Sequence, residues 1–449
     1  MRARLPAQWG LSALLWCGCC HAANDRRLID AVKDQNRTAV DALIAEHADV
    51  NAAQPDGATP LAWAVYLNQM ETADRLIKAG ANVNAADEYG ETPLTLACGI
   101  GNTTLIEKLL AAGADANAAR WNGETALMIA SRAGALAGVK LLLAHDAKVD
   151  AVDSRKGQNA LMWAAAEGHS DIVDLLIQNG ADAKRASIAG FTPLVFAAQK
   201  GDTRSVASLL AAGVDPNYVL PNGTSVLQVA VVEGKDQAAA LLLEKGASVN
   251  VADQGGNTPL HVASQAGNVK LVQSLLAKHA DPNARTGNAD SARQGGGGGF
   301  FRPAGAQTPL LMAARANREA VMRALVAAGA DPKLKADDGT NLLMAAAGSG
   351  HVEVVKYAYE LSPDIHAVTQ RKSTVMHAAV TGSMQSSTQA EVCKVVQFLA
   401  DKGADLDAVD GRGRTPMTTA NQLPIDTAVT LLGKLIEAGG NTPKQPAKR

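Results

Sequence analysis

The histidines and cysteines of this chain are the side chains that most often carry catalysis or bind metals. Nine histidines are scattered along the 449 residues. Five of them fall at expected helix ends or turns: His47, His145, His169, His279 and His351. No His-Glu-x-x-His zinc motif and no Gly-x-Ser-x-Gly nucleophile turn occurs. We therefore expect no catalytic residue, no bound metal, no cofactor and no enzymatic activity.

A period of about 33 residues positions every other feature of the chain. It is paced by glycines at Gly57, Gly90, Gly123, Gly157, Gly190, Gly223 and Gly256. Two residues after each glycine stands Thr, Ser or Asn, and proline often follows, as in Thr59-Pro60. The same column continues through Thr308, Asn341, Thr374 and Thr415. Because these residues cap a helix and proline suits its first position, each period predicts a helix start here.

The rest of each period predicts a pair of short helices. The first helix carries a small residue at a fixed place, such as Ala64 or Ala97. The second has apolar residues three and four apart, as in Ile172, Leu175 and Leu176, and ends at a glycine. In three periods a residue that tolerates positive φ replaces this glycine: His47, Asp146 and His279.

These features resemble the ankyrin repeat family. The motif Gly-x-Thr-Pro-Leu-x-x-Ala and the segment Leu-Leu-x-x-Gly-Ala-Asp recur. The terminal asparagine of the motif recurs at Asn84, Asn117, Asn217 and Asn250. The resemblance implies an all-α repeat solenoid, a curved array of about twelve ankyrin repeats, each a helix-turn-helix with a β-hairpin finger. Only His261 and His377 keep the family's histidine after Thr-Pro-Leu, so we expect weaker capping networks in the other repeats.

The repeats and their interruptions divide the chain into five segments. We expect a signal peptide at 1–22, repeats 1–8 at 23–283, a Gly-rich insertion at 284–306, repeats 9–12 at 307–440 and a polar tail at 441–449. Repeats of this kind contact only their neighbours. We therefore expect the repeats after the insertion to unfold separately from those before it.

The first 22 residues have the three-part pattern of a Sec-type signal. Arg2 and Arg4 precede an apolar run, and Ala22 offers a small-residue cleavage site. The run is short for a membrane span, and no other segment reaches a spanning length. We expect a bacterial protein that is periplasmic or secreted, with no membrane span. An uncleaved, buried N-terminal helix is the alternative.

Three of the five cysteines, Cys17, Cys19 and Cys20, fall inside the signal segment. Cleavage before Cys19 would create a lipid anchor, although the preceding residues match that signal poorly. Cys98 and Cys393 are almost nine repeats apart, which excludes a disulfide between them in a solenoid. We expect both to act as small buried hydrophobic residues.

One apolar column of the first helices is a candidate binding face. It reads Trp63, Leu96, Ile129, Trp163, Phe196, Val229, Val262 and Met312. Tyr66, on the same helix as Trp63, joins this face. Two interpretations stay open: a stripe of aromatic anchors along the concave face, or packing between repeats at a position where the family commonly has leucine.

The expected hairpin tips carry a second candidate surface, which we call the rim. Its basic and aromatic members are Tyr89, Arg120, Trp121, Arg155, Lys156, Lys184, Arg185 and Tyr218. They are either solvated turn residues or a surface that recognises an acidic protein. The chain has a net charge of −2, which does not favour a nucleic-acid partner.

The Gly-rich insertion places Phe300 and Phe301 directly after five glycines. Three interpretations stay open: an insertion without a role, a flexible arm that presents both rings to a partner, or rings that fold back onto the repeats. The strand–turn–helix context of a phosphate-binding glycine loop is missing, so we expect no nucleotide site.

Together these features predict a monomeric binding module. Its partner is another protein, bound after export through the concave face and the hairpin tips, with the chain acting as a scaffold or escort. A secreted effector or surface protein that binds a host or foreign protein is the alternative.

Overall fold

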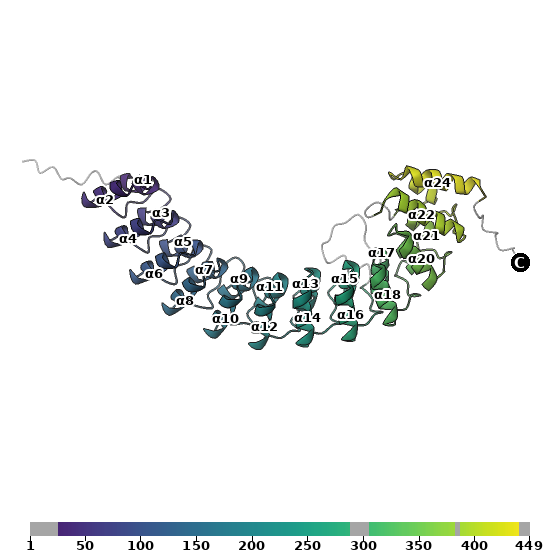
Figure 1. Cartoon of the computed structure of the whole chain (residues 1–449), viewed down its shortest axis with the longest axis horizontal. Coiled ribbons are helices and arrows are strands. Elements are labelled where there is room, and N and C mark those ends of the chain that lie inside the picture. Colours follow the sequence, from purple (N-terminus) through teal and green to yellow (C-terminus); the bar gives the residue numbers. More distant parts are fainter. Residues whose placement is uncertain (1–25, 288–304, 382–386, 440–449) are drawn as a thin grey trace, which may run out of the picture. The chain divides into compact units, whose positions relative to one another are not determined.

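The computed structural model describes residues 26–287, 305–381 and 387–439 (Figure 1). The predicted signal peptide, the Phe300-Phe301 pair and the predicted polar tail lie outside these residues. The described residues contain 24 helices. They alternate along the chain between a first and a second helix of each pair, as the 33-residue period predicts.

The first helices are short and most begin at a Thr-Pro or equivalent cap. They are α1 (Arg27–Lys33), α3 (Pro60–Tyr66), α5 (Pro93–Ile100), α7 (Ala126–Arg132), α9 (Ala160–Glu167), α11 (Pro193–Lys200), α13 (Val226–Val232), α15 (Pro259–Ala266), α17 (Pro309–Arg315), α19 (Leu342–Ala347), α21 (Val375–Thr381) and α23 (Pro416–Ala420).

The second helices are mostly nine residues long and carry the Leu-rich pattern. They are α2 (Arg37–Ala45), α4 (Met70–Lys78), α6 (Thr103–Ala111), α8 (Leu136–Ala144), α10 (Ser170–Gln178), α12 (Thr203–Ala211), α14 (Asp236–Glu244), α16 (Val269–Ala277), α18 (Glu319–Ala327), α20 (Val352–Leu361), α22 (Gln389–Asp401) and α24 (Asp426–Glu437).

The helix ends follow the local chemistry of the sequence. The Thr59 hydroxyl accepts from the Ala62 N–H at 3.2 Å, which satisfies one of the free amides of the first turn of α3. Where His47, Asp146 and His279 replace the glycine after a second helix, they adopt positive φ, whereas Ser362 after α20 has an extended backbone with φ of −152°. His47, Asp146 and His279 have φ of 59°, 60° and 65°. The predicted caps and turns are thus confirmed at these positions.

The chain forms two compact units, each a stack of helix pairs. The first comprises Met1–Trp163 with Gln178–Ala181, and the second comprises Ala164–Ile177 with Asp182–Arg449. In the first unit α1, α3, α5 and α7 pack in succession, and α2, α4, α6 and α8 form a second layer. In the second unit the same two layers run from α11 to α23 and from α12 to α24 (Figure 1).

Packing in the second unit continues across the Gly-rich insertion. Helix α15 contacts α17, and α16 contacts α18. The Gly287 N–H donates to the Gly255 carbonyl at 2.7 Å, so the chain stays attached to the stack where the insertion begins. The helix layers therefore continue past the insertion, and separate unfolding of the later repeats stays a prediction.

The core is a set of thin layers between neighbouring first helices. The fixed small residue of every such helix from the second to the ninth is fully buried: Ala64, Ala97, Ala130, Ala164, Ala197, Ala230, Ala263 and Ala313. A larger side chain at this place would collide with the adjacent helix, because interiors are packed to near-crystalline density.

The terminal asparagine of the motif connects one repeat to the next. Asn84 Nδ2 donates to the Gly113 carbonyl at 3.0 Å, and its Oδ1 accepts from the Asp115 N–H at 2.8 Å. The same pair of bonds recurs at Asn51, Asn117, Asn217, Asn250 and Asn283. We call this pair of bonds the asparagine staple.

The capping networks are not uniformly weaker where the histidine is missing, which corrects our expectation. His261 is buried and its Nε2 lies 3.0 Å from the Gln307 carbonyl of the next repeat. Gln228 occupies the same column and donates through Nε2 to the Asn257 carbonyl of the next repeat at 3.2 Å. A glutamine amide therefore reaches the carbonyl that the imidazole would reach.

Two further observations concern the hairpin fingers and the length of the helices. In the part of the chain that the structure describes, the predicted β-hairpin fingers appear only as two isolated bridges, Ala119–Thr125 and Val219–Ser225. None of the described helices combines the length and the hydrophobicity needed to cross a bilayer.

Candidate protein-binding surface

Trp121 is the most exposed large aromatic side chain among the described residues of the first unit. It lies at a tip and stacks on a cation from the next tip. Its side chain is 62% exposed, and the Arg155 guanidinium lies 4.4 Å from its ring centroid. The tips themselves are joined by backbone bonds. The Trp121 N–H donates to the Tyr89 carbonyl at 3.0 Å, and the Ser154 N–H donates to the Asn122 carbonyl at 2.8 Å. The stack is therefore held on an ordered backbone.

Trp163, at the start of α9, lies under two cations. The Arg132 guanidinium, at the end of α7, is 5.1 Å from its ring centroid, and the Lys156 ammonium is 6.0 Å away. The ring is half-buried. Cations over an indole face are attracted by its negative quadrupole.

Trp63, on α3, has a similar environment. The Lys33 ammonium lies 4.1 Å from its ring centroid, and Tyr66 meets it edge to face at 5.7 Å. Its indole N–H donates to Gln54 Oε1 at 3.1 Å. By contrast, the indole N–H of Trp163 is buried and has no acceptor among the described residues.

A row of alternating charges lies behind these tips. Arg120 forms ion pairs with Glu91 and, at 2.7 Å, with Glu124, and Arg132 reaches Glu124 at 3.3 Å. Burial lowers the pKa of the Arg120 guanidinium. The hydrogen bonds that it donates to the carboxylates of Glu91 and Glu124 raise this pKa more, so it ends above its ordinary value. Arg120 is thus a structural residue of the first unit, not a free cation of the rim as its type suggested.

The rim is not uniformly basic. Tyr89 is 55% exposed, and its hydroxyl is hydrogen-bonded to Glu88. That bond, together with the charges of Glu88, Asp87 and Asp56, raises the pKa of the Tyr89 hydroxyl. The positive part of the rim in the first unit is therefore confined to Arg155 and Lys156, and the tips before it are acidic.

The apolar column has one buried member, so it is not a continuous exposed stripe. Ile129 is only 1% exposed, although Trp63, Leu96 and Trp163 are half-buried. A Cβ placed on Gly99 would lie 3.6 Å from Ile129 Cγ2, an ordinary contact distance, so this isoleucine packs closely against the first helix of the preceding repeat. Ile129 fits the packing interpretation, and the binding stripe stays a prediction at the half-buried positions.

The predicted residues of the second unit form separate features. Phe196 is half-buried and contacts Phe191 with their centroids 5.4 Å apart. Tyr218 donates its hydroxyl to the Gly190 carbonyl at 2.6 Å, which assigns it a structural role. Lys184 is exposed and Arg185 is half-buried.

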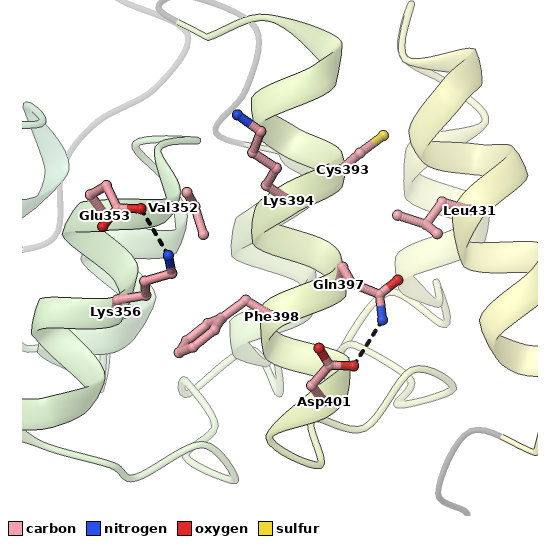
Figure 2. Close-up of a pocket in the computed structure, with 9 residues that line it drawn as sticks. All are labelled: Val352, Glu353, Lys356, Cys393, Lys394, Gln397, Phe398, Asp401 and Leu431. Carbon is pink, nitrogen blue, oxygen red and sulfur yellow. Dashed lines mark hydrogen bonds and ion pairs between the residues drawn. The ribbon is translucent and has the colours of Figure 1, made fainter.

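A shallow groove of about 680 Å³ lies among α20, α22 and α24 of the second unit. Figure 2 shows Cys393 directed toward Leu431 of α24, while Phe398 is directed toward α20. Its polar groups pair with each other: Glu353 with Lys356 at 2.8 Å and Gln397 with Asp401 at 2.8 Å (Figure 2). Cys393 is half-buried here, not fully buried as expected, because it lies at the edge of the open groove.

The sequence analysis missed Lys33 and Arg132. Each is the last residue of a first helix, one helical turn after the position that the apolar column occupies in that repeat. A search for a cation at that place before each tryptophan would have found both.

Within the described ranges, no three His, Cys, Asp or Glu side chains lie close enough to share a metal ion.

Three comparisons with known proteins bear on this arrangement. The sequence profile described as "Ankyrin repeats (3 copies)" matches residues 28–120, 99–187, 194–286 and 310–410. No curated protein sequence matches the chain. Among solved structures, the crystal structure of the human ASB11 ankyrin repeat domain is similar, with 27% identity and a TM-score of 0.46; the match covers 53% of this chain and 98% of that one.

Proposed function

Because the chain belongs to the ankyrin repeat family, whose repeats generally mediate protein–protein interactions, we propose that it binds a partner protein through the tips and first helices of its first unit. Family members are typically binding scaffolds without enzymatic activity. We count each helix pair as one repeat, which makes twelve.

The observation that carries this proposal is the exposed Trp121–Arg155 stack on hydrogen-bonded tips. Tryptophan and arginine are enriched among the residues that dominate the binding energy of protein interfaces. Tryptophan offers a large contact area with only two side-chain torsions to fix, and arginine offers five N–H donors. A fully structural tryptophan would be buried, yet most of the Trp121 side chain faces solvent. Trp63, Tyr66 and Trp163 extend the same surface along the first helices. The other residues that we propose to contact the partner are Lys184, Arg185, Phe196, Phe300 and Phe301.

We further propose that the protein acts after export from a bacterial cell, as a scaffold or escort in the periplasm. This rests on the signal pattern of the first 22 residues. A secreted effector or surface protein that binds a foreign protein uses the same surface and differs only in where it acts.

The test is an affinity capture with residues 23–449 from a periplasmic extract, followed by mass spectrometry. We expect one stoichiometric partner that is lost when Trp121 and Arg155 are both changed to Ala. Val368→Ala is the matched control, because Val368 is also an exposed apolar residue but lies in the second unit. A partner that survives the double change would show that this surface is the wrong one. An empty capture, with the protein present in the culture medium, would favour the secreted effector.

A further inference from the structure

We propose that Arg155, Lys156 and Trp163 together bind the carboxylates of an acidic segment of the partner protein. This set of three residues is called the carboxylate cluster below. The inference rests on the proposed function and names the chemistry of the partner at that surface.

The first observation is a surplus of positive charge at one tip. Arg155 and Lys156 are adjacent and exposed, and neither forms an ion pair with any described residue. Behind them the charges balance, because Arg120 and Arg132 face Glu91 and Glu124. The two tip cations are therefore available to an external anion.

The nearest carboxylate of the same turn, Asp153, is already occupied. It is buried and accepts from three backbone N–H groups: Arg155 at 2.9 Å, Lys156 at 2.6 Å and Gln158 at 2.8 Å. These bonds fix the backbone of the tip from which both cations project. Asp153 positions the cluster and leaves its two side-chain cations unpaired.

The second observation is the orphan indole N–H of Trp163. The corresponding indole N–H of Trp63 donates to the Gln54 side chain. Gln54 begins the turn before α3, where its backbone N–H donates to the Ala58 carbonyl. Asp153 opens the corresponding turn before Trp163, bonding to the Gln158 carbonyl, but its oxygens are used by the backbone. A buried donor without an acceptor is costly, so an incoming acceptor is favoured at this place.

A carboxylate suits both observations, because its two oxygens accept from a cation and from an indole N–H together. The Lys156 ammonium lies 6.0 Å from the ring centroid on a flexible stem, so it can reorient toward a carboxylate that accepts from this ring. A long polyanion such as a nucleic acid is disfavoured, because the preceding tips carry Asp56, Asp87 and Glu88. A protein segment with a short acidic run meets the cations and avoids those acids.

The probe is the acetylated and amidated peptide Glu-Glu-Leu-Glu-Glu, added to ¹⁵N-labelled residues 23–449. Three of the five tryptophans, Trp63, Trp121 and Trp163, fall in this chain, so the indole N–H spectrum has three peaks. We expect the Trp163 peak to move downfield as the peptide binds. The Trp63 peak is the internal control and should stay, because its N–H already donates to Gln54.

Matched variants and peptides complete the test. Lys156→Gln should weaken the peptide's affinity about fivefold, and Lys245→Gln, a change at an exposed lysine of the second unit, should leave it unchanged. The peptide Gln-Gln-Leu-Gln-Gln should not move the Trp163 peak. The inference is overturned if the acidic peptide leaves Trp163 unmoved, or if the neutral peptide shifts it equally.

This experiment separates the inference from the proposed function. If capture yields a partner that depends on Trp121 but the acidic peptide has no effect on Trp163, the carboxylate cluster is wrong and the binding function stands. If the peptide binds but no partner is captured from any extract, the cluster stands and the proposed function fails.

Discussion

Asn84 and Asp115 are joined by a hydrogen bond of 2.8 Å from the Asp115 N–H to the Asn84 side chain, across the boundary between two repeats. The same side chain donates to the Gly113 carbonyl. A backbone donor and a backbone acceptor of the turn, 31 and 29 positions away, are thus both satisfied by one side chain. This explains why asparagine, which has both an N–H and a C=O, ends so many repeats.

Asn84→Ala is expected to lower the free energy of unfolding by about 1–2 kcal/mol, because two partly exposed hydrogen bonds are lost. Urea unfolding monitored by circular dichroism measures this. Glu107→Ala, an exposed change on α6 without a side-chain bond in the described chain, should stay within about 0.5 kcal/mol. If both changes lower the free energy of unfolding equally, the asparagine staple does not stabilise the fold.

Arg120→Met is expected to cost about 2–3 kcal/mol, because it leaves the half-buried carboxylates of Glu91 and Glu124 without their shared cation. Arg204→Met is the control: Arg204 also pairs with two acids, but it is exposed, so the loss should stay below about 1 kcal/mol. Restoring stability by adding Glu91→Gln and Glu124→Gln to Arg120→Met would confirm the cause. Failure of that rescue would point to lost packing instead.

His261 is expected to make stability depend on pH near neutrality. Burial lowers the pKa of its imidazole below the ordinary value of 6.5, outweighing the opposing carbonyl bond and nearby carboxylates. The folded state therefore binds fewer protons than the unfolded state, so its contribution is complete above pH 6.5 and falls as the pH drops below that value. The midpoint of urea unfolding, measured between pH 7.5 and 5, should fall with decreasing pH.

His261→Gln should reduce that pH dependence at little cost in stability at pH 7.5, because Gln228 makes the corresponding bond in the preceding repeat. The reciprocal change Gln228→His introduces a further buried imidazole and should make the dependence steeper. An unchanged slope in both variants would exclude these positions as its source.

The two cysteines outside the signal segment are expected to differ in reactivity. Cys98 is fully buried, and burial raises the pKa of its thiol to about 12, so it holds almost no thiolate at pH 8. Cys393 lies at the open groove of the second unit. Iodoacetamide labelling of residues 23–449, read by peptide mass spectrometry, should modify Cys393 rapidly and Cys98 only in urea. Rapid labelling of Cys98 in the native protein would contradict its burial.

Local features were predictable at single positions. Thr59 caps α3, and Asp146 takes positive φ after α8, because both depend on the conformation of a few adjacent residues. The site was only partly predictable. Trp121 is exposed as its tip position suggested, but Ile129 is buried, because it packs against the first helix of the preceding repeat.

By itself the sequence determined the helix pairs, their caps and their order, because a 33-residue period repeats short-range chemistry at every turn. The tertiary structure decided which side chains of neighbouring repeats meet. It placed Arg132 over Trp163 and Lys33 over Trp63, and it assigned Arg120 to an internal ion pair. Such pairings depend on rotamers and on contacts about one repeat apart, and the helix period alone does not specify them.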